Sequence, residues 1–571
     1  MDKPECYGPH SRWRLRWAWF GCALSLLASS PVAALPPYGP VEISGNIAAQ
    51  QVIRHRDIDR YDFVQQRNTL KLRVDYTAID DGKLIERLPV PFIDRTKLFV
   101  LYRGVYDSVY DYTPGFSQED IYGQPIGERL DDLRGREGLR FENRLREAYL
   151  DVRLKNLPLS FRLGRQQIVW GETDNFRMLD RVNALDLSWH LQQESWDELR
   201  TPYWMIKGLW EIGEAAPLSD AFLEFYWNPG DWHPAKRAFL PRPWSAPISN
   251  PLRPAIAIFQ TDRLAHGTKL FQQGDYTRNP MDNSQVGVRL SALSPQGVQF
   301  TLNYFYQRWA GDDGTNAAAV RALTRRSDIA AARARGELPV EAVAPYVHAI
   351  GASLNYAEQN YTQAVLRAET VYELGVPFAD AAKPFPDPPL NRDLFGISKH
   401  DMWKGMIAFD RPTWIKPLNR NSTFLVLGQF FWHYLVDNPP IACRDPGEAP
   451  PCAVSGQGQG LRGQFSDSGN NAGAAFIDKV RDWELLATLA ATSFYRGGKL
   501  VPFLVYVIDP VNNYNQEVIF MADYFITNNL IFNLTQRYFI NTTSNPVFET
   551  WGVAGLNRGR SETSLRLTYQ Y

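Results

Sequence analysis

The sequence predicts an all-β protein, a transmembrane antiparallel up-and-down β-barrel of about eighteen strands. Three observations predict it. Apolar residues recur at every second position in most segments, short and long linkers alternate between those segments, and the chain ends at Tyr571 on one more alternating strand. Period-two alternation is the pattern of strands that have one apolar and one polar face.

The alternation is clearest between residues 143 and 172. Apolar and polar residues alternate over 148–154, Pro158 interrupts the pattern, and a second run begins at Leu159. Proline cannot donate to a β-ladder, so the two runs indicate a hairpin. Because such hairpins recur along the chain without a helical core pattern, they favour a closed barrel whose apolar face meets lipid and whose polar face lines the lumen.

Length, charge and the N-terminus are consistent with such a barrel. After the first residues, no apolar run in the 571-residue chain approaches the roughly 18 to 20 residues that a spanning helix needs. Residues 1–34 carry three arginines, an apolar core and small residues up to Ala34, which predicts a cleaved signal peptide. Residues 35–571 then form a single barrel domain. The 61 basic and 62 acidic residues nearly balance, which gives no indication of a nucleic-acid partner.

Each candidate strand is an alternating run bounded by turn residues. The predicted strands are residues 41–54, 67–77, 96–106, 141–155, 159–169, 203–212, 221–227, 285–293, 298–309, 346–356, 362–372, 401–410, 422–433, 481–494, 500–508, 515–525, 530–540 and 561–571.

The linkers indicate which side of the membrane each turn occupies. Those after even-numbered strands are mostly short, such as 156–158 and 526–529, whereas those after odd-numbered strands are mostly long, such as 228–284 and 434–480. Short periplasmic turns and long external loops are typical of bacterial outer-membrane barrels. The linker 78–95 should be short and is long, so a merged or missed pair of strands there gives an alternative of sixteen strands.

The last strand and the tryptophans carry further signals. The alternating segment 561–571 ends on an aromatic residue and resembles the signal by which the barrel-assembly machinery recognises its clients. That machinery, outer-membrane lipid and lipopolysaccharide are therefore expected partners. Tryptophans near strand ends are predicted in the interfacial girdles, with core positions as the alternative. These are Trp210, Trp227, Trp309, Trp403 and Trp432.

Several runs resemble a known family. They are LREAYLDVRL, FRLGRQQIVWGETDNFRMLDRVNALDL, VLRAETVY, MIAFDRP and the closing ETSLRLTYQY. Together they resemble the Gram-negative outer-membrane family catalogued as domain of unknown function 1302, and the stretch 164–187 is the most specific part. The resemblance implies a barrel in the outer membrane. It also implies a periplasmic carrier and an inner-membrane permease as partners, and hence traffic of a hydrophobic substance.

Residues 170–202 form the candidate functional segment, a constriction or plug. The segment leaves an external strand end and is rich in charged and aromatic residues. We expect it to fold into the barrel, with Arg177 and Arg181 paired to wall carboxylates. Its candidate site residues are Glu172, Asp174, Arg177, Asp180, Arg181, Asp186, Trp189 and Trp196.

Alternation also assigns charged residues to the lumen. Basic and acidic residues nearly balance there, which disfavours an anion-selective pore and favours cross-strand pairs that stiffen the wall. The candidate lumen-lining residues are Arg73, Arg103, Glu147, Asp151, Arg153, Arg162, Glu369, Arg367, Asp482, Glu484, Asp523 and Arg566.

Other residue patterns indicate no cofactor and no catalytic centre. Cys443 and Cys452, nine residues apart in an exported chain, predict a disulfide within a loop. The histidines are scattered without metal-ligand spacing. The leading hypothesis is a conduit for a hydrophobic or amphiphilic small molecule or lipid. The alternatives are a surface-binding or structural barrel with ligand-gripping loops and, last, an outer-membrane lipase-like enzyme.

Overall fold

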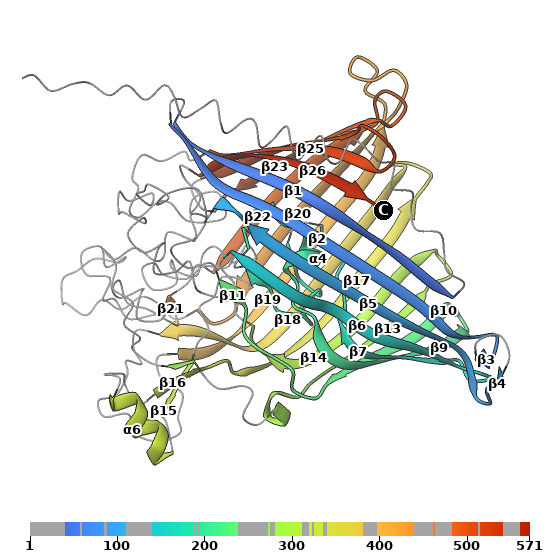
Figure 1. Cartoon of the computed structure of the whole chain (residues 1–571), viewed down its shortest axis with the longest axis vertical. Coiled ribbons are helices and arrows are strands. Elements are labelled where there is room, and N and C mark those ends of the chain that lie inside the picture. Colours follow the sequence, from blue (N-terminus) through green and yellow to red (C-terminus); the bar gives the residue numbers. More distant parts are fainter. Residues whose placement is uncertain are drawn as a thin grey trace, which may run out of the picture.

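The computed structural model describes residues 40–57, 60–84, 88–109, 140–174, 176–187, 189–190, 193–237, 272–273, 280–310, 319–322, 325–334, 340–380, 397–438, 461–462, 482–511, 514–540 and 560–571. The predicted signal peptide and the predicted disulfide lie outside these residues, so both stay predictions. Within this part of the chain, 21 strands form one sheet. Figure 1 shows that the sheet curves into a barrel.

Eighteen of these strands make the barrel wall in the described residues, and each pairs antiparallel with its neighbours. They are β1 (Val41–Asp57), β2 (Arg60–Asp80), β5 (Ile93–Asp107), β6 (Phe141–Leu154), β7 (Leu159–Gln166), β9 (Tyr203–Ala215), β10 (Leu218–Asn228), β13 (Gln285–Leu293), β14 (Val298–Arg308), β17 (Tyr346–Glu358), β18 (Ala364–Asp380), β19 (Ile397–Thr413), β20 (Phe424–Leu435), β22 (Trp483–Ser493), β23 (Leu500–Asp509), β24 (Asn515–Phe525), β25 (Leu530–Ile540) and β26 (Ser561–Gln570).

The wall closes because the last strand pairs with the first. β26 lies antiparallel to β1 from Asn46 opposite Gln570 to His55 opposite Ser561. Two backbone hydrogen bonds continue the seam, from Gly45 N to Tyr571 O and from Tyr571 N to Gly45 O. Closure leaves no free sheet edge between the first and last strands, as a membrane-spanning sheet requires.

The eighteen-strand prediction is confirmed, and each predicted strand overlaps one wall strand. The long linker at 78–95 is not a missed pair of wall strands. β2 continues to Asp80, and the short strands β3 (Lys83–Leu84) and β4 (Leu88–Pro89) form a small hairpin on it. In Figure 1 this hairpin projects from one end of the barrel.

The outward face of the wall is apolar. Leu302, Ile350 and Ile407 are each more than half exposed, at 52%, 55% and 55%. Trp210, Trp227 and Trp403 are exposed as well, as predicted for girdle residues. Trp309 is buried against Val347 and Leu435, so its girdle assignment is wrong. It follows Arg308, the last residue of β14, where alternation no longer fixes the side a residue faces.

The remaining elements are small. They are β8 (Asp186–Leu187), β11 (Lys236–Arg237), β12 (Gln272–Gln273), β15 (Ala319–Ala322), β16 (Val340–Val343), β21 (Leu461–Arg462), the α-helices α4 (Trp196–Leu199) and α6 (Arg326–Ala334), and the 3-10 helix η4 (Pro280–Asn283). No helix among the described residues is long and apolar enough to cross a membrane.

Candidate functional site inside the barrel

The segment between β7 and β9 leaves the wall and returns to it at adjacent positions. Gln166, the last residue of β7, pairs with Tyr203, the first of β9. The Asn183 side chain joins the two ends of the segment, which we call the inner segment (residues 167–202). Its Nδ2 donates to Gln166 O and Thr201 O, at 3.3 and 2.8 Å, and its Oδ1 accepts from Ile168 N at 2.9 Å. Asn183 is fully buried.

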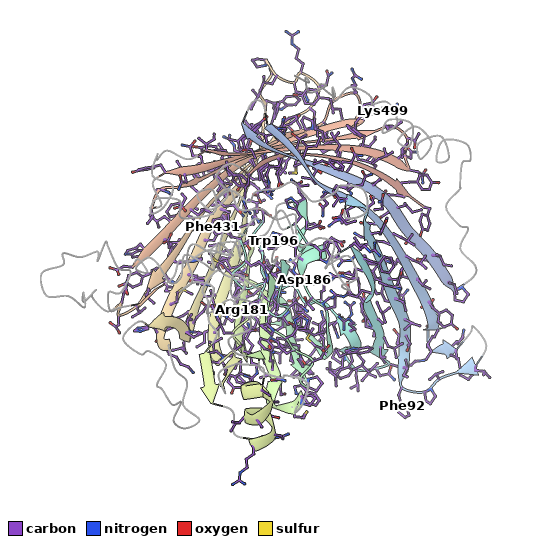
Figure 2. All side chains as sticks on the ribbon, turned by 60° about the vertical axis from the view of Figure 1, so that its left-hand side comes forward. Phe92, Arg181, Asp186, Trp196, Phe431 and Lys499 are labelled. Carbon is purple, nitrogen blue, oxygen red and sulfur yellow. The ribbon has the colours of Figure 1, made fainter. Side chains whose placement is uncertain are left out.

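The inner segment lies inside the barrel. Figure 2 shows Arg181, Asp186 and Trp196 within the ring of strands. Their contacts agree, since segment residues bond to wall residues on strands from both sides of the barrel. The fold therefore contains the inward-folded loop that the sequence predicts.

On one side, the acidic strand β18 holds the inner segment. The buried carboxylate of Glu369 accepts the backbone N–H groups of Glu172 and Leu179, at 2.8 and 2.6 Å. Arg181 forms an ion pair with Glu373, which also pairs with Lys404 of β19 at 3.3 Å. Burying Glu373 is tolerable because it is paired with two cations.

A second set of contacts lies beside the first. Arg367 pairs with Asp174 at 2.7 Å and with Asp410 of β19 at 2.8 Å. Gln429 of β20 also donates to Asp174, at 2.9 Å. The Asn355 side chain of β17 donates to Glu172. The start of the inner segment is thus fixed directly to β17, β18 and β20, and Asp410 of β19 supports it through Arg367.

On the opposite side, basic wall residues hold the helix α4. Glu198 pairs with Lys71 of β2 and, at 2.7 Å, with Arg103 of β5. Burial acts to raise the pKa of the Glu198 carboxyl, but the positive charges of Lys71 and Arg103 outweigh it and hold this pKa far below its usual range. Glu198 therefore stays ionised in acid, and the ion pairs persist.

A β-bulge on β6 directs a third basic residue to the same place. The register of β5 and β6 shifts between the pairs Leu101–Glu147 and Tyr102–Leu145, which leaves Arg146 as the extra residue. Its Nη2 donates to the carbonyl oxygens of Asp197 and Arg200, at 2.8 and 2.7 Å. A bulge changes the direction of a side chain in this way, and here Arg146 binds the end of α4.

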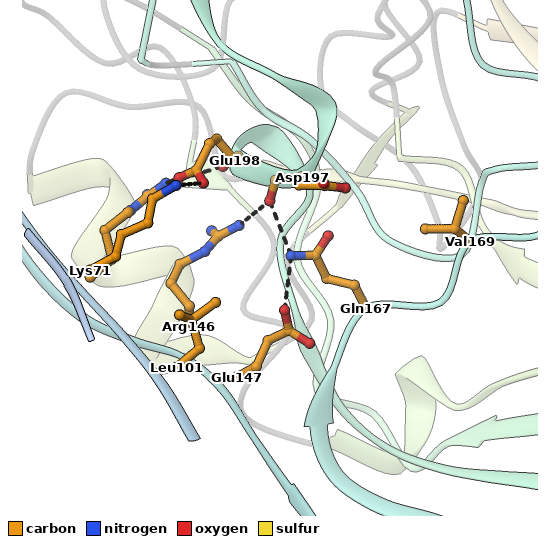
Figure 3. Close-up of a pocket in the computed structure, with 9 residues that line it drawn as sticks. Lys71, Leu101, Arg146, Glu147, Gln167, Val169, Asp197 and Glu198 are labelled. Atoms are coloured by element: carbon orange, nitrogen blue, oxygen red, sulfur yellow. Dashed lines mark hydrogen bonds and ion pairs between the residues drawn. The ribbon is translucent and has the colours of Figure 1, made fainter. Parts of the chain in front are cut away.

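A cavity of about 330 Å³ remains beneath α4. Figure 3 shows it between the helix and the inner wall. Its lining mixes both charges with two apolar side chains. The lining residues are Lys71, Leu101, Arg103, Arg146, Glu147, Gln167, Val169, Asp197 and Glu198. The inner segment therefore does not fill the lumen in the described part of the chain.

The inner segment also reaches the seam of the barrel. His190 Nε2 lies 2.8 Å from Glu562 Oε2 on β26, and the other oxygen of Glu562 accepts from Arg54 of β1 at 2.9 Å. Glu194 pairs with Arg67 of β2. Glu562, whose side chain links β26 to β1, therefore also contacts the inner segment.

Aromatic contacts complete the packing of the inner segment. Phe176 meets Phe431 of β20 edge to face, with ring centroids 5.1 Å apart. Trp170 packs against Tyr226 and Phe305 of the wall at 5.4 and 5.2 Å. These rings make the inner segment part of a packed core.

The predicted segment residues divide into wall contacts and internal contacts. Of the two predicted arginine pairs, Arg181 binds a wall carboxylate, whereas Arg177 pairs with Asp180 of the same segment at 3.4 Å. Asp180 also binds Arg200 at 2.6 Å. The other wall contacts are made by Glu172, Asp174, Asp186 and Trp189, and Trp196 donates to Asp174 O.

The predicted lumen-lining residues mostly form pairs along the wall. Arg73 pairs with Asp75 at 2.5 Å, Asp151 with Arg162 at 2.7 Å, and Asp523 accepts from Asn533. Arg153 lies between Asp94 and Glu211, Glu147 lines the cavity, and Glu484 and Arg566 are buried or half-buried on the inner face. Asp482 differs, because it is exposed just before β22 and accepts from Asn438 rather than lining the wall.

Alternation also assigns Lys71 to the lumen, and it lies there. Some residues of the site were not among the predicted ones. They are Asn183, Arg146, Glu373, His190 and Glu562. Alternation signals the wall residues Glu373 and Glu562, but nothing local indicates that Asn183 would join the ends of the inner segment. Among the described residues, no cluster of His, Cys, Asp and Glu could hold a metal ion.

Comparison with known proteins gives one family and a set of distant barrels. The family model described as "Protein of unknown function (DUF1302)" matches residues 57–485. No curated protein matches the chain. Solved structures that align with 93% of it include a BenF-like porin from Pseudomonas fluorescens Pf-5 (TM-score 0.44, 8% identity, 99% of that chain) and OccAB3 of Acinetobacter baumannii (0.43, 8%, 99%). OmpF of Salmonella typhi in complex with daunomycin also aligns (0.36, 8%, 97%).

Proposed function

Since the chain belongs to the family described as protein of unknown function DUF1302, for which that description gives no activity, we propose a function from the barrel itself. The protein is an outer-membrane conduit, and its inner segment sets the width of the passage. Its cargo is a hydrophobic or amphiphilic small molecule or lipid.

One observation carries the proposal: the inner segment crosses the lumen and leaves a cavity of about 330 Å³ against the wall. Residues from β2, β5, β17, β18 and β26 hold it by hydrogen bonds and ion pairs. A barrel with only a structural role would be expected to have its lumen filled by side chains. Here the lumen holds a separate segment docked through polar contacts, which suits a constriction.

The proposed partners follow from this location. Outer-membrane lipid and lipopolysaccharide would surround the apolar outer face, and the assembly machinery would bind the terminal strand β26. A periplasmic carrier and an inner-membrane permease would supply or receive the cargo. The family resemblance supports these last two partners, and co-purification after crosslinking in cells would test them.

Planar-bilayer recording of two forms of the protein tests the proposal. The wild type is expected to conduct weakly, because the inner segment narrows the passage. Deletion of residues 175–193 removes Arg181 and His190, with their contacts to β18 and β26, and is expected to raise the conductance severalfold. The deletion variant must first show the compact, heat-sensitive migration of a folded barrel. Absence of conductance in both folded forms would contradict a channel.

A further inference from the structure

The cavity beneath α4 lies where two neighbouring strands separate. The last pair between β6 and β7 joins Ala148 and Arg165. Beyond it, β6 continues along β5 as far as Phe141, whereas the chain after β7 turns inward as the inner segment. The cavity, which we call the α4 cavity, is lined by the next residues of both chains together with residues of β2, β5 and α4.

The acidic side chains that line the α4 cavity already have partners. Glu198 and Asp197 each form ion pairs, and Glu147 accepts a hydrogen bond from a neutral amide at 3.5 Å. The partners are Lys71 and Arg103 for Glu198, Arg200 for Asp197, and Gln167 for Glu147. None of the three carboxylates forms an ion pair with Arg146, although all four residues line the cavity.

Arg146 is therefore a buried cation without a paired anion in the described part of the chain. The residue is 2% exposed. Its Nη2 donates to two carbonyl oxygens at the end of α4, which fixes the guanidinium, but its Nη1 has no hydrogen-bond partner among the described residues. Buried charges are normally paired, because removing a charge from water without compensation is costly. The position of Arg146 thus suits an anion that is not part of the chain.

The α4 cavity also presents open surface of two kinds. The Lys71 side chain is 20% exposed, and an ammonium group has three N–H donors, of which Glu198 occupies one. Val169 is 46% exposed, and Leu101 lies in the same lining. The volume of about 330 Å³ falls in the range of small-molecule pockets. Cationic donors beside exposed apolar side chains form a site for an amphiphilic anion.

We propose that the α4 cavity binds the anionic head of the transported molecule, a carboxylate or phosphate that accepts from Arg146 Nη1 and Lys71 Nζ. The apolar part of the molecule lies against Leu101 and Val169. This inference rests on the proposed conduit and narrows its cargo to amphiphilic anions. Acidic and basic residues nearly balance over the lumen as a whole, so the site is local and does not make the whole wall selective for anions.

Ligands that differ only in the head group test the proposal. The full mature protein is placed in lipid nanodiscs, and binding of radiolabelled octanoate, octyl phosphate and octanol is measured above that of empty nanodiscs. The wild type should bind at least one of the two anions more tightly than octanol by roughly 10- to 150-fold, the contribution of one hydrogen bond to a charged group. The anion with the higher affinity identifies the head as carboxylate or phosphate.

Arg146→Gln removes the positive charge and should abolish most of the preference for the anion. If Arg146 only held α4 in place, the affinities for the anion and for octanol would fall together and their ratio would persist, which would overturn the proposal. Arg289→Gln is the matched control. Arg289 of β13 lies outside the cavity lining, and its partner Glu224 remains paired with Lys207 at 2.6 Å. This variant should keep the preference of the wild type.

Photocrosslinking locates the site in the wild type and needs no variant to fold. An octanoate analogue with a diazirine at the end of its chain should label peptides that contain Leu101 or Val169. Labelling confined to the outer face of the wall would overturn the proposal. Equal affinity of the wild type for the anions and octanol, as expected if water alone fills the cavity, would overturn it too, and so would loss of the preference in both arginine variants.

Conductance of the same proteins separates this inference from the proposed function. A preference for the anion that depends on Arg146, without any conductance, would contradict the conduit and leave the α4 cavity as an anion-binding site. Conductance without a preference for the anion would keep the conduit and overturn the anion site.

Discussion

At the scale of single residues, the carboxylate of Glu369 decides whether the inner segment stays docked on β18. Its two oxygens accept two backbone N–H groups, from Glu172 and Leu179. Glu369→Gln replaces one acceptor with an amide donor and leaves a buried N–H unpaired, at a cost of about 1–3 kcal/mol. Hydrogen exchange of the backbone at 172–179 should therefore accelerate by roughly 5- to 150-fold.

The control for Glu369→Gln lies elsewhere on the wall. Asp523→Asn changes the same chemical group on β24, where the carboxylate accepts from Asn533 of the neighbouring strand. Exchange at 172–179 should be unchanged in this variant. Equal acceleration in both variants would mean that the wall as a whole had loosened, and would contradict a specific role for Glu369.

Glu198 allows a prediction about pH. Its carboxyl is more acidic in the folded protein than in the unfolded chain, so the stabilisation it gives is complete above its unfolded pKa and is lost only as pH falls through its depressed folded pKa. Glu198 should therefore hold α4 equally well at pH 7 and pH 5. The open-channel current noise of Glu198→Gln should exceed that of the wild type at both values, since α4 then loses its ion pairs.

Glu147→Gln is the comparison for Glu198→Gln. Glu147 lines the same cavity and is bonded to the Gln167 side chain at 3.5 Å. Its substitution should leave the noise close to that of the wild type. Equal noise in Glu198→Gln and the wild type at either pH would contradict the assigned role of Glu198.

Alternation predicts which charged residues face inward, but not which partners they meet. It places Glu369 and Arg103 correctly, because a strand fixes the side that each residue faces. The Arg181–Glu373 pair joins residues 192 positions apart, and only the closed barrel brings them together. Arg146 shows a second limit, since its bulge breaks the two-residue period from which direction is inferred.

At the scale of elements, Gly164 sets how closely β6 and β7 approach. Its φ of +137° is unfavourable for residues with a side chain, and a Cβ there would lie 2.3 Å from Ala148 O and 2.7 Å from Tyr149 Cα. Gly164→Ala must strain its own backbone, at about 1–3 kcal/mol, and push the strands apart. The midpoint of urea unfolding in detergent should fall.

Gly208→Ala tests whether any glycine in this part of the wall is equally sensitive. A Cβ at Gly208 would meet the ring of Phe225 at 2.3 Å, and a side chain can rotate away where a backbone cannot. The unfolding midpoint should fall less than for Gly164→Ala. A larger fall for Gly208→Ala would contradict the close approach as the cause.

The positions of the wall strands could be predicted from the sequence. For the inner segment, the sequence indicated a candidate functional segment but not the path that it takes through the barrel. Each wall strand carries its own alternation, so local sequence suffices to locate it, although β2 begins seven residues before the predicted start at Arg67. The two-residue strands β3 and β4 are too short for any period to be recognised. The course of 167–202 depends on Glu369, Glu198 and other distant partners, which no local pattern contains.

At the scale of the whole molecule, the inner wall has three distinct regions. Basic residues of β2, β5 and β6 bind α4, and acidic residues of β18 bind the start of the inner segment. The third is a row of paired apolar residues on the inner faces of β20, β22, β23 and β24, namely Leu427, Ala490, Val505 and Ile519, which belong to or pack against the core that includes Phe176 of the inner segment. The expectation of a polar lumen therefore holds for only part of the wall. On β20, β22, β23 and β24, apolar residues occupy inner as well as outer positions.

The seam between β1 and β26 gives the prediction for the whole barrel. Deleting residues 561–571 removes β26, which pairs with both β1 and β25, so two strand edges would be left open in lipid, where unpaired backbone groups are very costly. Deleting Tyr571 alone removes two backbone bonds to Gly45 and one side-chain bond to Lys71 O. At about 1 kcal/mol for each hydrogen bond, deletion of Tyr571 should lower the free energy of unfolding by roughly 3 kcal/mol.

Refolding into detergent micelles without assembly factors tests whether β26 is needed to close the barrel. It does so separately from any recognition of this strand by the assembly machinery in the cell. The protein lacking 561–571 should give no compact, heat-sensitive band on gels, whereas the protein lacking only Tyr571 should fold with a lower urea midpoint. Tyr571→Ala keeps the backbone bonds and should fall between that variant and the wild type. A compact band without β26 would mean that β1 pairs directly with β25, and closure would then not depend on the terminal strand.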